Sequence, residues 1–418
     1  MSPTFQALVV RNYRIYWLGG LVSNSGTWMQ RVAQDWLVLQ LTHSGTALGI
    51  TTGLQFLPFL LATPYAGLIA DRYPKRRVLL VTQASLTLTA GVLGLLAITG
   101  VAQTWHVYVL ALLFGLGTSF DTPARQSFVV EMVGRDYLPN AVGLNSASFN
   151  IGRIVGPGLA GLMIAALGSG VSATGWVILL NAVSYLAVIA SLRAMRGAEL
   201  ASVVLVPRAK GALRLGLRHV RNSPDLVFVF VVAFFSGTFG LNFQMTSALM
   251  ATGVFHKGAG AYGILGSIMA IGSLAGALLA ARRGYPRRAL LVLAALSFAA
   301  AEIVAGLMPS YLLFAVWLPV IGITSLTMLN SLQTVVQLSV GPEVRGRVMA
   351  LYMMTLMGGT PVGAPIIGWV GETFGPRWTL IGGGLGTGIA VVLATVWLVR
   401  KQDIDLREMS GLPAKIAA

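Results

Sequence analysis

Cysteine is absent from the 418 residues, and charged residues are scarce, at 10% of the chain. Without thiols the chain has no disulfide, no thiolate nucleophile and no cysteine metal site. A soluble protein usually carries about 25% charged residues, so most of this surface must face something other than water. There is also no histidine or carboxylate cluster with metal-ligand spacing, no Gly-rich loop ending in Gly-Lys-Ser/Thr, and no convergent catalytic constellation. We therefore expect neither an enzyme nor an ATP-driven machine, and we expect no cofactor and no metal.

Long apolar runs dominate the chain instead. Hydrophobic residues make up 56% of it, and 50 glycines favour close helix packing in a bilayer. A helix needs about 20 apolar residues to cross the hydrocarbon core, and strand-type alternation is missing. No signal peptide is expected, because apolar segments follow the N-terminus to the end of the chain. The sequence predicts an all-α membrane protein with twelve transmembrane helices, at residues 15–40, 46–69, 78–99, 105–124, 141–166, 173–193, 225–250, 260–281, 289–308, 311–334, 348–371 and 378–400.

Lysine and arginine set the expected orientation. With the N-terminus inside, 25 of the 29 basic residues fall in cytoplasmic segments, and only Lys257 and Arg377 fall outside. This asymmetry predicts that both termini are cytoplasmic. It also explains the net charge of +16 without nucleic acid, because the cations lie in short clusters between apolar runs.

The chain contains an internal repeat. Val-Arg-Asn occurs at 10–12 and again at 220–222, and Tyr-Pro followed by two cations occurs at 73–76 and 285–288. Two weaker matches, before and within spans five and eleven, have nearly the same offset. Two parallel six-span halves are the plan of one large transporter class, with the binding site near the midplane between them. We expect an N-terminal six-helix bundle at 1–193, a cytoplasmic linker at 194–222, and a C-terminal bundle with a short tail at 223–418.

The loop after the second span reads Gly-Leu-Ile-Ala-Asp-Arg at 67–72, followed by Tyr-Pro-Lys-Arg-Arg. It resembles the loop signature of the major facilitator superfamily, although the usual glycine is missing at the place of Pro74. The glycine permits close helix contact, and a carboxylate here can cap or pair at a helix end. We expect Asp71 near the start of span eleven, within a cytoplasmic gate. The gate residues are Gly67, Asp71, Arg72, Lys75, Asp121 and Arg125.

Span five resembles the glycine-proline motif of antiporters in that superfamily, through Gly152, Gly156, Pro157 and Gly161. The residues at 28–30, 120–126 and 138–141 are similar to the bacterial efflux branch that includes the enterobactin exporter. The resemblance implies two pseudo-symmetric six-helix bundles in a bacterial plasma membrane. It also implies export of a small amphipathic compound, such as a drug, siderophore or metabolite, by proton antiport, in a monomer. One departure is that the arginine common in span four of related exporters would fall near Ala111.

Ionisable residues within spans are costly and usually face a cavity or a partner. Arg31 and Asp35 lie one helical turn apart and can pair. We expect Asp35 to couple transport to protons, with Arg31 as its modulator and Glu302 as the next candidate. Arg153 needs a partner at the midplane, for which Asp35, Asp121 and the backbone carbonyls freed near Pro157 are candidates. The residues expected to line the substrate cavity are Asn24, Trp28, Gln34, Gln55, Asn145, Arg153, Asn242 and Gln244.

Two other functions stay open. One is a lipid or lysolipid flippase, or an importer, of the same fold. The other is a membrane sensor without transport, which we favour less because the longest linker, residues 194–222, is too short for a soluble sensing domain.

Overall fold

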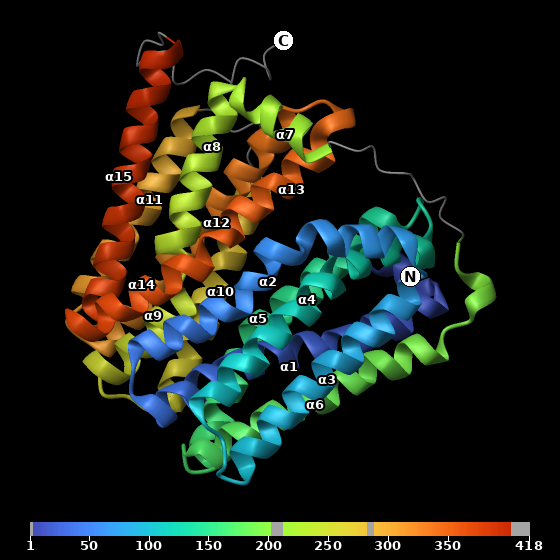
Figure 1. Cartoon of the computed structure of the whole chain (residues 1–418), viewed down its shortest axis with the longest axis horizontal. Coiled ribbons are helices and arrows are strands. Elements are labelled where there is room, and N and C mark those ends of the chain that lie inside the picture. The colour runs from blue at the N-terminus through green and yellow to red at the C-terminus, as the bar shows by residue number, and fades with distance from the viewer. Residues whose placement is uncertain (1–2, 202–211, 282–287, 403–418) are drawn as a thin grey trace. The chain divides into compact units, whose positions relative to one another are not determined.

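The structure, a computed structural model, describes residues 3–201, 212–281 and 288–402, and within these ranges it contains helices and no strand (Figure 1). The side chain of Asp71 lies outside the described part.

The first half of the chain forms six long helices. A short 3-10 helix, η1 (Pro3–Val9), precedes them, and another, η2 (Gly197–Glu199), follows them. His43, at φ 52°, ends the first helix, and Ser44 caps the second by accepting a hydrogen bond of 3.1 Å from the Ala47 N–H. The long helices are α1 (Arg11–Thr42), α2 (Gly45–Arg72), α3 (Lys75–Ile98), α4 (Thr104–Val133), α5 (Leu138–Ala166) and α6 (Val171–Ala194).

The second half has more interruptions. The span expected at 225–250 is broken by two π-turns, in which Leu241 bonds to the Ser236 carbonyl and Phe255 to the Met250 carbonyl. The span expected at 348–371 breaks at Gly358 and resumes at Thr360. The elements are α7 (Ala212–Arg221), α8 (Pro224–Phe235), η3 (Ser236–Gly240), α9 (Phe243–Leu249), η4 (Met250–Val254), α10 (Ala259–Ala281), α11 (Arg288–Leu307), α12 (Tyr311–Leu338), α13 (Pro342–Gly358), α14 (Thr360–Thr373) and α15 (Arg377–Gln402).

Eleven segments of the described chain are long and apolar enough to cross a membrane. They correspond to the expected spans two to twelve. The remaining expected span is α1, whose low hydropathy follows from its polar side chains, among them Asn24, Gln30, Arg31, Gln34 and Asp35. The fold class expected from the sequence, an all-α membrane protein, is confirmed.

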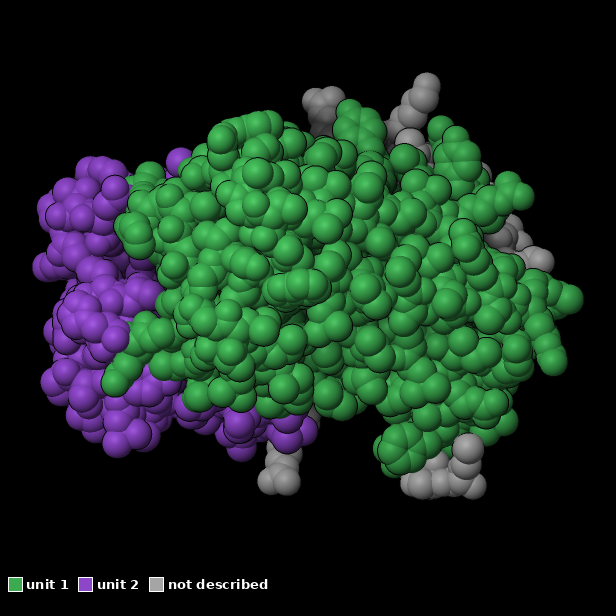
Figure 2. Space-filling model, turned by 90° about the horizontal axis from the view of Figure 1, so that it is seen from below, with its two compact units in different colours: residues 1–47, 54–207, 257–267 green, residues 48–53, 208–256, 268–418 purple. Residues whose placement is uncertain are grey.

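The helices form two compact units (Figure 2). The first unit comprises residues 1–47, 54–207 and 257–267, and in it α1 packs on α5 and α6 while α3 packs on α4 and α6. The second comprises residues 48–53, 208–256 and 268–418, and in it α11 packs on α12 and α15. The expected linker contains α7, which packs on α13 in the second unit, and residues 202–211 of it lie outside the described part. The bundle boundaries at 193 and 223 stay a prediction.

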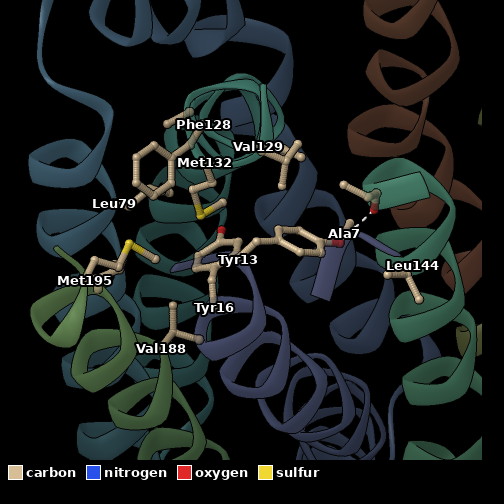
Figure 3. Close-up of a cluster of buried hydrophobic side chains, with 14 residues drawn as sticks. Ala7, Tyr13, Tyr16, Leu79, Phe128, Val129, Met132, Leu144, Val188 and Met195 are labelled. Atoms are coloured by element: carbon tan, nitrogen blue, oxygen red, sulfur yellow. Dashed lines mark hydrogen bonds between the residues drawn. The ribbon is translucent and has the colours of Figure 1, made fainter. Parts of the chain in front are cut away.

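A cluster of buried side chains lies within the first unit (Figure 3). It joins η1, α1, α3, α4, α5 and α6 around Tyr13 and Tyr16. The Tyr13 hydroxyl donates to the Ala141 carbonyl at 2.8 Å, so even this apolar cluster fixes its phenol by hydrogen bonding. The cluster packs five long helices against one another, and this packing fixes the positions of the polar residues next to it.

Candidate functional site

A cavity of about 670 Å³ lies within the first unit, between α1, α3, α4, α5 and α6. Four of its lining side chains are aromatic, namely Tyr16, Trp17, Phe149 and Tyr185. The polar lining includes Asn24, Asn145, Asp121 and Arg125, all of which the sequence had singled out. A cavity of this size with apolar walls and a few placed polar groups is typical of a small-molecule site.

Asp121 is the most densely bonded carboxylate of the cavity wall. Its Oδ1 accepts hydrogen bonds of 2.8 Å from the Thr82 hydroxyl and from Gln83 Nε2, and its Oδ2 pairs with Arg125 Nε at 2.9 Å. The residue is only 6% exposed. Three donors from α3 and α4 therefore hold the carboxylate in place. Its expected role in a gate with Asp71 stays a prediction, because the Asp71 side chain lies outside the described part.

Arg125 and Tyr16 lie together beside Asp121. The guanidinium carbon is 5.7 Å from the centre of the Tyr16 ring, and that ring meets Phe128 edge-on at 6.0 Å. The hydroxyl of Tyr16 and the side-chain oxygen of Gln83 are buried without a hydrogen-bond partner among the described residues. Figure 3 shows Tyr16 next to Tyr13 and Phe128. The cavity wall therefore has polar atoms that the protein itself leaves unsatisfied.

Two other cavity residues have protein partners. Asn24 donates to the Ser148 hydroxyl at 2.9 Å, and Asn145 accepts from the Tyr13 hydroxyl at 3.0 Å. Both bonds connect α1 with α5. These side chains thus fix the spacing of two cavity walls as well as lining the space between them.

The loop between α2 and α3 is anchored inside the first unit. Lys75 pairs with Glu131 of α4 at 2.6 Å, and Arg76 donates to the Leu192 carbonyl at the end of α6 at 2.7 Å. Sequence reasoning missed Glu131 because it ended span four at residue 124, whereas α4 continues to Val133. The signal was present: Glu131 is a carboxylate that follows an apolar run directly. Arg72 at the end of α2 is exposed, and Gly67 lies on the same helix.

Asp35 lies near the end of α1 and is 8% exposed. The Tyr262 hydroxyl donates to its Oδ2 at 2.7 Å, and the ring of Tyr262 stacks on Trp36. The Arg31 guanidinium lies 5.0 Å from the centre of the Trp28 ring and 5.9 Å from that of Phe56, so two aromatic faces contact the cation. The pairing of Arg31 with Asp35 that the sequence led us to expect stays a prediction.

The glycines of span five let helices approach closely. A β-carbon at Gly156 would lie 2.7 Å from Cβ of Trp28, and one at Gly152 would lie 2.9 Å from the backbone of α1. On the other side, Gly161 faces Gly263 of α10, again at 2.9 Å, and Pro157 faces Gly266. The motif therefore packs α5 against α1 and against the first turns of α10.

The other expected cavity residues do not line this cavity. Arg153 forms no hydrogen bond or ion pair with any described residue, contrary to our expectation that Asp35 or Asp121 would bind it. Gln34 is buried, and the backbone of Gln55 lies against Gly115. Asn242 and Gln244 belong to the second unit, where Asn242 Nδ2 donates to the Thr238 carbonyl at 2.9 Å.

Glu302 is buried in the second unit at 1% exposure. Its Oε2 has no hydrogen-bond partner among the described residues, and neither has the nearby Thr387 hydroxyl. Gly240 of the π-turn η3 and Gly383 of α15 surround the carboxyl group. An ionised carboxylate is costly in such a place, and the role of Glu302 as the next candidate for proton coupling stays a prediction.

The eleven apolar spans of the described chain define a multi-pass membrane protein, and comparison with known proteins places it in the major facilitator superfamily. The fold is similar to that of a bacterial homologue of the human lysosomal transporter Spinster, with a TM-score of 0.67 at 18% identity over 99% of this chain and all of that one. Within the superfamily, residues 2–417 match the family described as transmembrane secretion effector, and the chain belongs to this family. The expected resemblance to the superfamily is thereby confirmed.

Two characterised relatives cover nearly the whole chain. The multidrug efflux pump Tap of Mycolicibacterium fortuitum is 31% identical over 400 residues, which are 92% of this chain and 95% of the pump. The enterobactin exporter EntS of Shigella boydii is 24% identical over 416 residues, 97% of this chain and 95% of the exporter. Members of this superfamily are transporters of small molecules and not enzymes, as the sequence led us to expect.

Proposed function

We propose that the chain exports a small amphipathic compound by proton antiport, with alternating access of the cavity to the two sides of a bacterial plasma membrane. The observation that carries the proposal is the cavity of the first unit, whose aromatic and polar walls suit a molecule with both an apolar body and polar groups. The names of the two relatives, an efflux pump and an exporter, support the outward direction. The charge asymmetry of the loops supports cytoplasmic termini.

Asp35 is our candidate for proton coupling. It is buried, it accepts a hydrogen bond from Tyr262, and Arg31 is one helical turn away on the same helix. A coupling carboxyl group must gain and lose a proton as its surroundings change. A conformational change that breaks the Tyr262 bond or moves Arg31 toward Asp35 would alter its proton affinity in the required way.

The test uses everted membrane vesicles with an imposed proton gradient and a panel of amphipathic compounds. Export appears there as uptake that collapses when the gradient is dissipated. Asp35→Asn should abolish gradient-driven uptake while substrate exchange without a gradient survives. If this variant still concentrates substrate with an unchanged pH dependence, Asp35 is not the coupling site and Glu302→Gln is tested next. No gradient-dependent transport of any compound by the wild type would refute antiport.

A second candidate is translocation of a lipid or lysolipid. An apolar groove of about 430 Å³ lies between α2, α3 and α4 in the first unit, and its wall includes Val81, Leu113, Leu116 and the cation of Arg77. Such a groove suits an acyl chain with an anionic headgroup. Protein-dependent movement of a fluorescent lysolipid between the leaflets of reconstituted liposomes would support this function, and its absence would remove it.

A further inference from the structure

The cavity of the first unit contains two charged lining residues, Asp121 and Arg125, among those that the structure describes. They form an ion pair, so the cavity has no net charge from its own wall. Whether a substrate can bind the carboxylate or the guanidinium therefore depends on how many hydrogen bonds each group already makes. The two partners differ sharply in this respect.

The carboxylate of Asp121 is nearly saturated. A carboxylate has about four lone-pair directions, and Thr82, Gln83 and Arg125 already occupy three of them. Since the residue is also 6% exposed, little of it remains for an incoming ammonium group. The pair thus offers a cationic substrate almost nothing.

Arg125 has the opposite balance. A guanidinium carries five N–H donors, and here only Nε is used within the described part of the chain. The side chain lines the cavity and is 27% exposed. Two terminal nitrogens with parallel N–H groups match the two oxygens of a carboxylate, a geometry that gives both strength and orientation.

Two orphaned polar atoms stand beside this cation. The Tyr16 hydroxyl and Gln83 Oε1 are buried, line the cavity, and have no partner among the described residues. A buried polar atom without a partner costs about 1–3 kcal/mol. A shift of the Tyr16 or Gln83 side chain that opens these atoms to the cavity on binding would let a ligand hydroxyl accept from the first and donate to the second. Trp17 and Phe149 supply apolar surface to the same cavity.

We propose that the cavity selects an organic carboxylate that carries a hydroxyl group and an apolar body, with the carboxylate held by the terminal nitrogens of Arg125. Asp121 acts as a positioning residue, because its three donors keep the arginine at the wall. Gln83 Oε1 and the Tyr16 hydroxyl bind the substrate hydroxyl. This inference rests on the proposed function, since it names the class of compound that the transporter moves.

The test compares salicylate with salicylamide, its uncharged analogue of the same shape, and with the cation benzyltrimethylammonium. Equilibrium binding is measured on the full chain in lipid nanodiscs. The wild type should bind salicylate more tightly than either other probe. Arg125→Gln should weaken salicylate binding by about tenfold or more while leaving salicylamide unchanged, since a hydrogen-bonded ion pair is lost. Arg125→Lys should retain part of the preference, because it keeps the charge but not the fork.

Two further variants make the sign of the result decisive. Asp121→Asn leaves Arg125 without its counter-charge, so salicylate binding should tighten, whereas a cation site built on Asp121 would be abolished. The double variant Asp121→Asn, Arg125→Gln removes both members of the ion pair, so no buried charge is left without a partner and the protein should fold. Because the guanidinium is gone, this variant should lose the preference for salicylate. Arg196→Gln, which removes a cation paired only with Glu199 at the surface, is the matched control and should bind like the wild type.

Equal binding of salicylate and salicylamide by the wild type overturns the proposal. The proposal also fails if the wild type binds benzyltrimethylammonium more tightly than salicylate and Asp121→Asn abolishes that binding. Failure of the inference is distinct from failure of the proposed function. Gradient-driven transport of cations or neutral compounds in vesicles, together with no selectivity for salicylate, would keep the transporter and discard its anion site.

Discussion

The phenol of Tyr262 donates a hydrogen bond of 2.7 Å to the carboxylate of Asp35, across 227 positions of the chain. The tyrosine belongs to the first turn of α10 and the aspartate to the last turns of α1. Its ring also stacks on Trp36, so the hydroxyl is held in place by more than the bond itself. A hydrogen bond to an ionised group contributes about 1.5–3 kcal/mol.

Tyr262→Phe removes this donor and keeps the stacked ring. We expect a loss of about 1–2 kcal/mol in stability, because Asp35 loses a hydrogen-bond donor, and a changed pH profile of transport if Asp35 couples transport to protons. The measurements are thermal unfolding in detergent and uptake over a pH series. Tyr352→Phe is the matched control, since that buried hydroxyl has no partner among the described residues; its removal should raise stability or leave it unchanged, and should not alter the pH profile. An identical pH profile for Tyr262→Phe would separate this bond from coupling.

Gly156→Val should disrupt the packing of α5 against α1. Even the first added carbon would lie 2.7 Å from Cβ of Trp28 and 2.9 Å from the Ser25 carbonyl oxygen, so the helices must separate. We expect a loss of about 1–3 kcal/mol, together with reduced transport, measured by thermal unfolding and vesicle uptake. Gly143→Ala on the same helix is the control, because its added carbon meets nothing within 4 Å and helix propensity improves. Equal stability of the two variants would argue against close packing at Gly156.

Lys75→Gln should cost stability because it leaves the carboxylate of Glu131 unpaired. Both side chains are largely buried, at 7% and 14% exposure, and removing one partner of a buried pair costs about 3–5 kcal/mol. Glu131→Gln added to Lys75→Gln should recover much of this loss. The exposed pair of Arg196 and Glu199 provides the contrast, where Arg196→Gln should cost less than about 1 kcal/mol. The free energy of unfolding is measured by chemical denaturation. If the loss in the double variant equals the sum of the losses in the two single variants, the two residues do not interact.

Glu302→Gln should leave folding intact, because glutamine has the shape of the neutral carboxyl group that this dry position favours. Glu302→Ala should destabilise the second unit by opening a cavity beside Gly240 and Gly383. If Asp35 couples transport to protons, Glu302→Gln also keeps gradient-driven uptake. Loss of that uptake in a well-folded Glu302→Gln variant would move the coupling site to α11.

Hydropathy was sufficient to place eleven of the twelve expected spans on long apolar segments of the described chain, since it reflects the cost of moving polar groups into lipid. Glycine spacing likewise identified the packing face of α5. What they could not give was the partner of each side chain. Arg31 and Asp35 have the spacing of an ion pair, yet Trp28 and Phe56 surround the guanidinium and Tyr262 binds the carboxylate. A partner 227 positions away leaves no local trace in one sequence.

Asp121 illustrates the same limit within the cavity. Its position near the end of span four suggested a gate, which stays a prediction, but nothing in the sequence indicated that Thr82 and Gln83 of α3 donate hydrogen bonds to it. The unsatisfied atoms of Tyr16 and Gln83 could not be found from sequence at all, because an orphaned polar group is defined by what its neighbours fail to supply.

The two π-turns in the span from Pro224 to Val254 change which way its side chains point. In each, a backbone N–H reaches the carbonyl five residues earlier, as in Leu241 to Ser236 and Phe255 to Met250, so each turn holds one residue more than an α-helical turn would. One extra residue turns the side chains beyond it by about 100° relative to the pattern of an uninterrupted α-helix. A single 3.6-residue stripe therefore does not describe this span, and the face that α9 presents differs from the one that the pattern of α8 would give it.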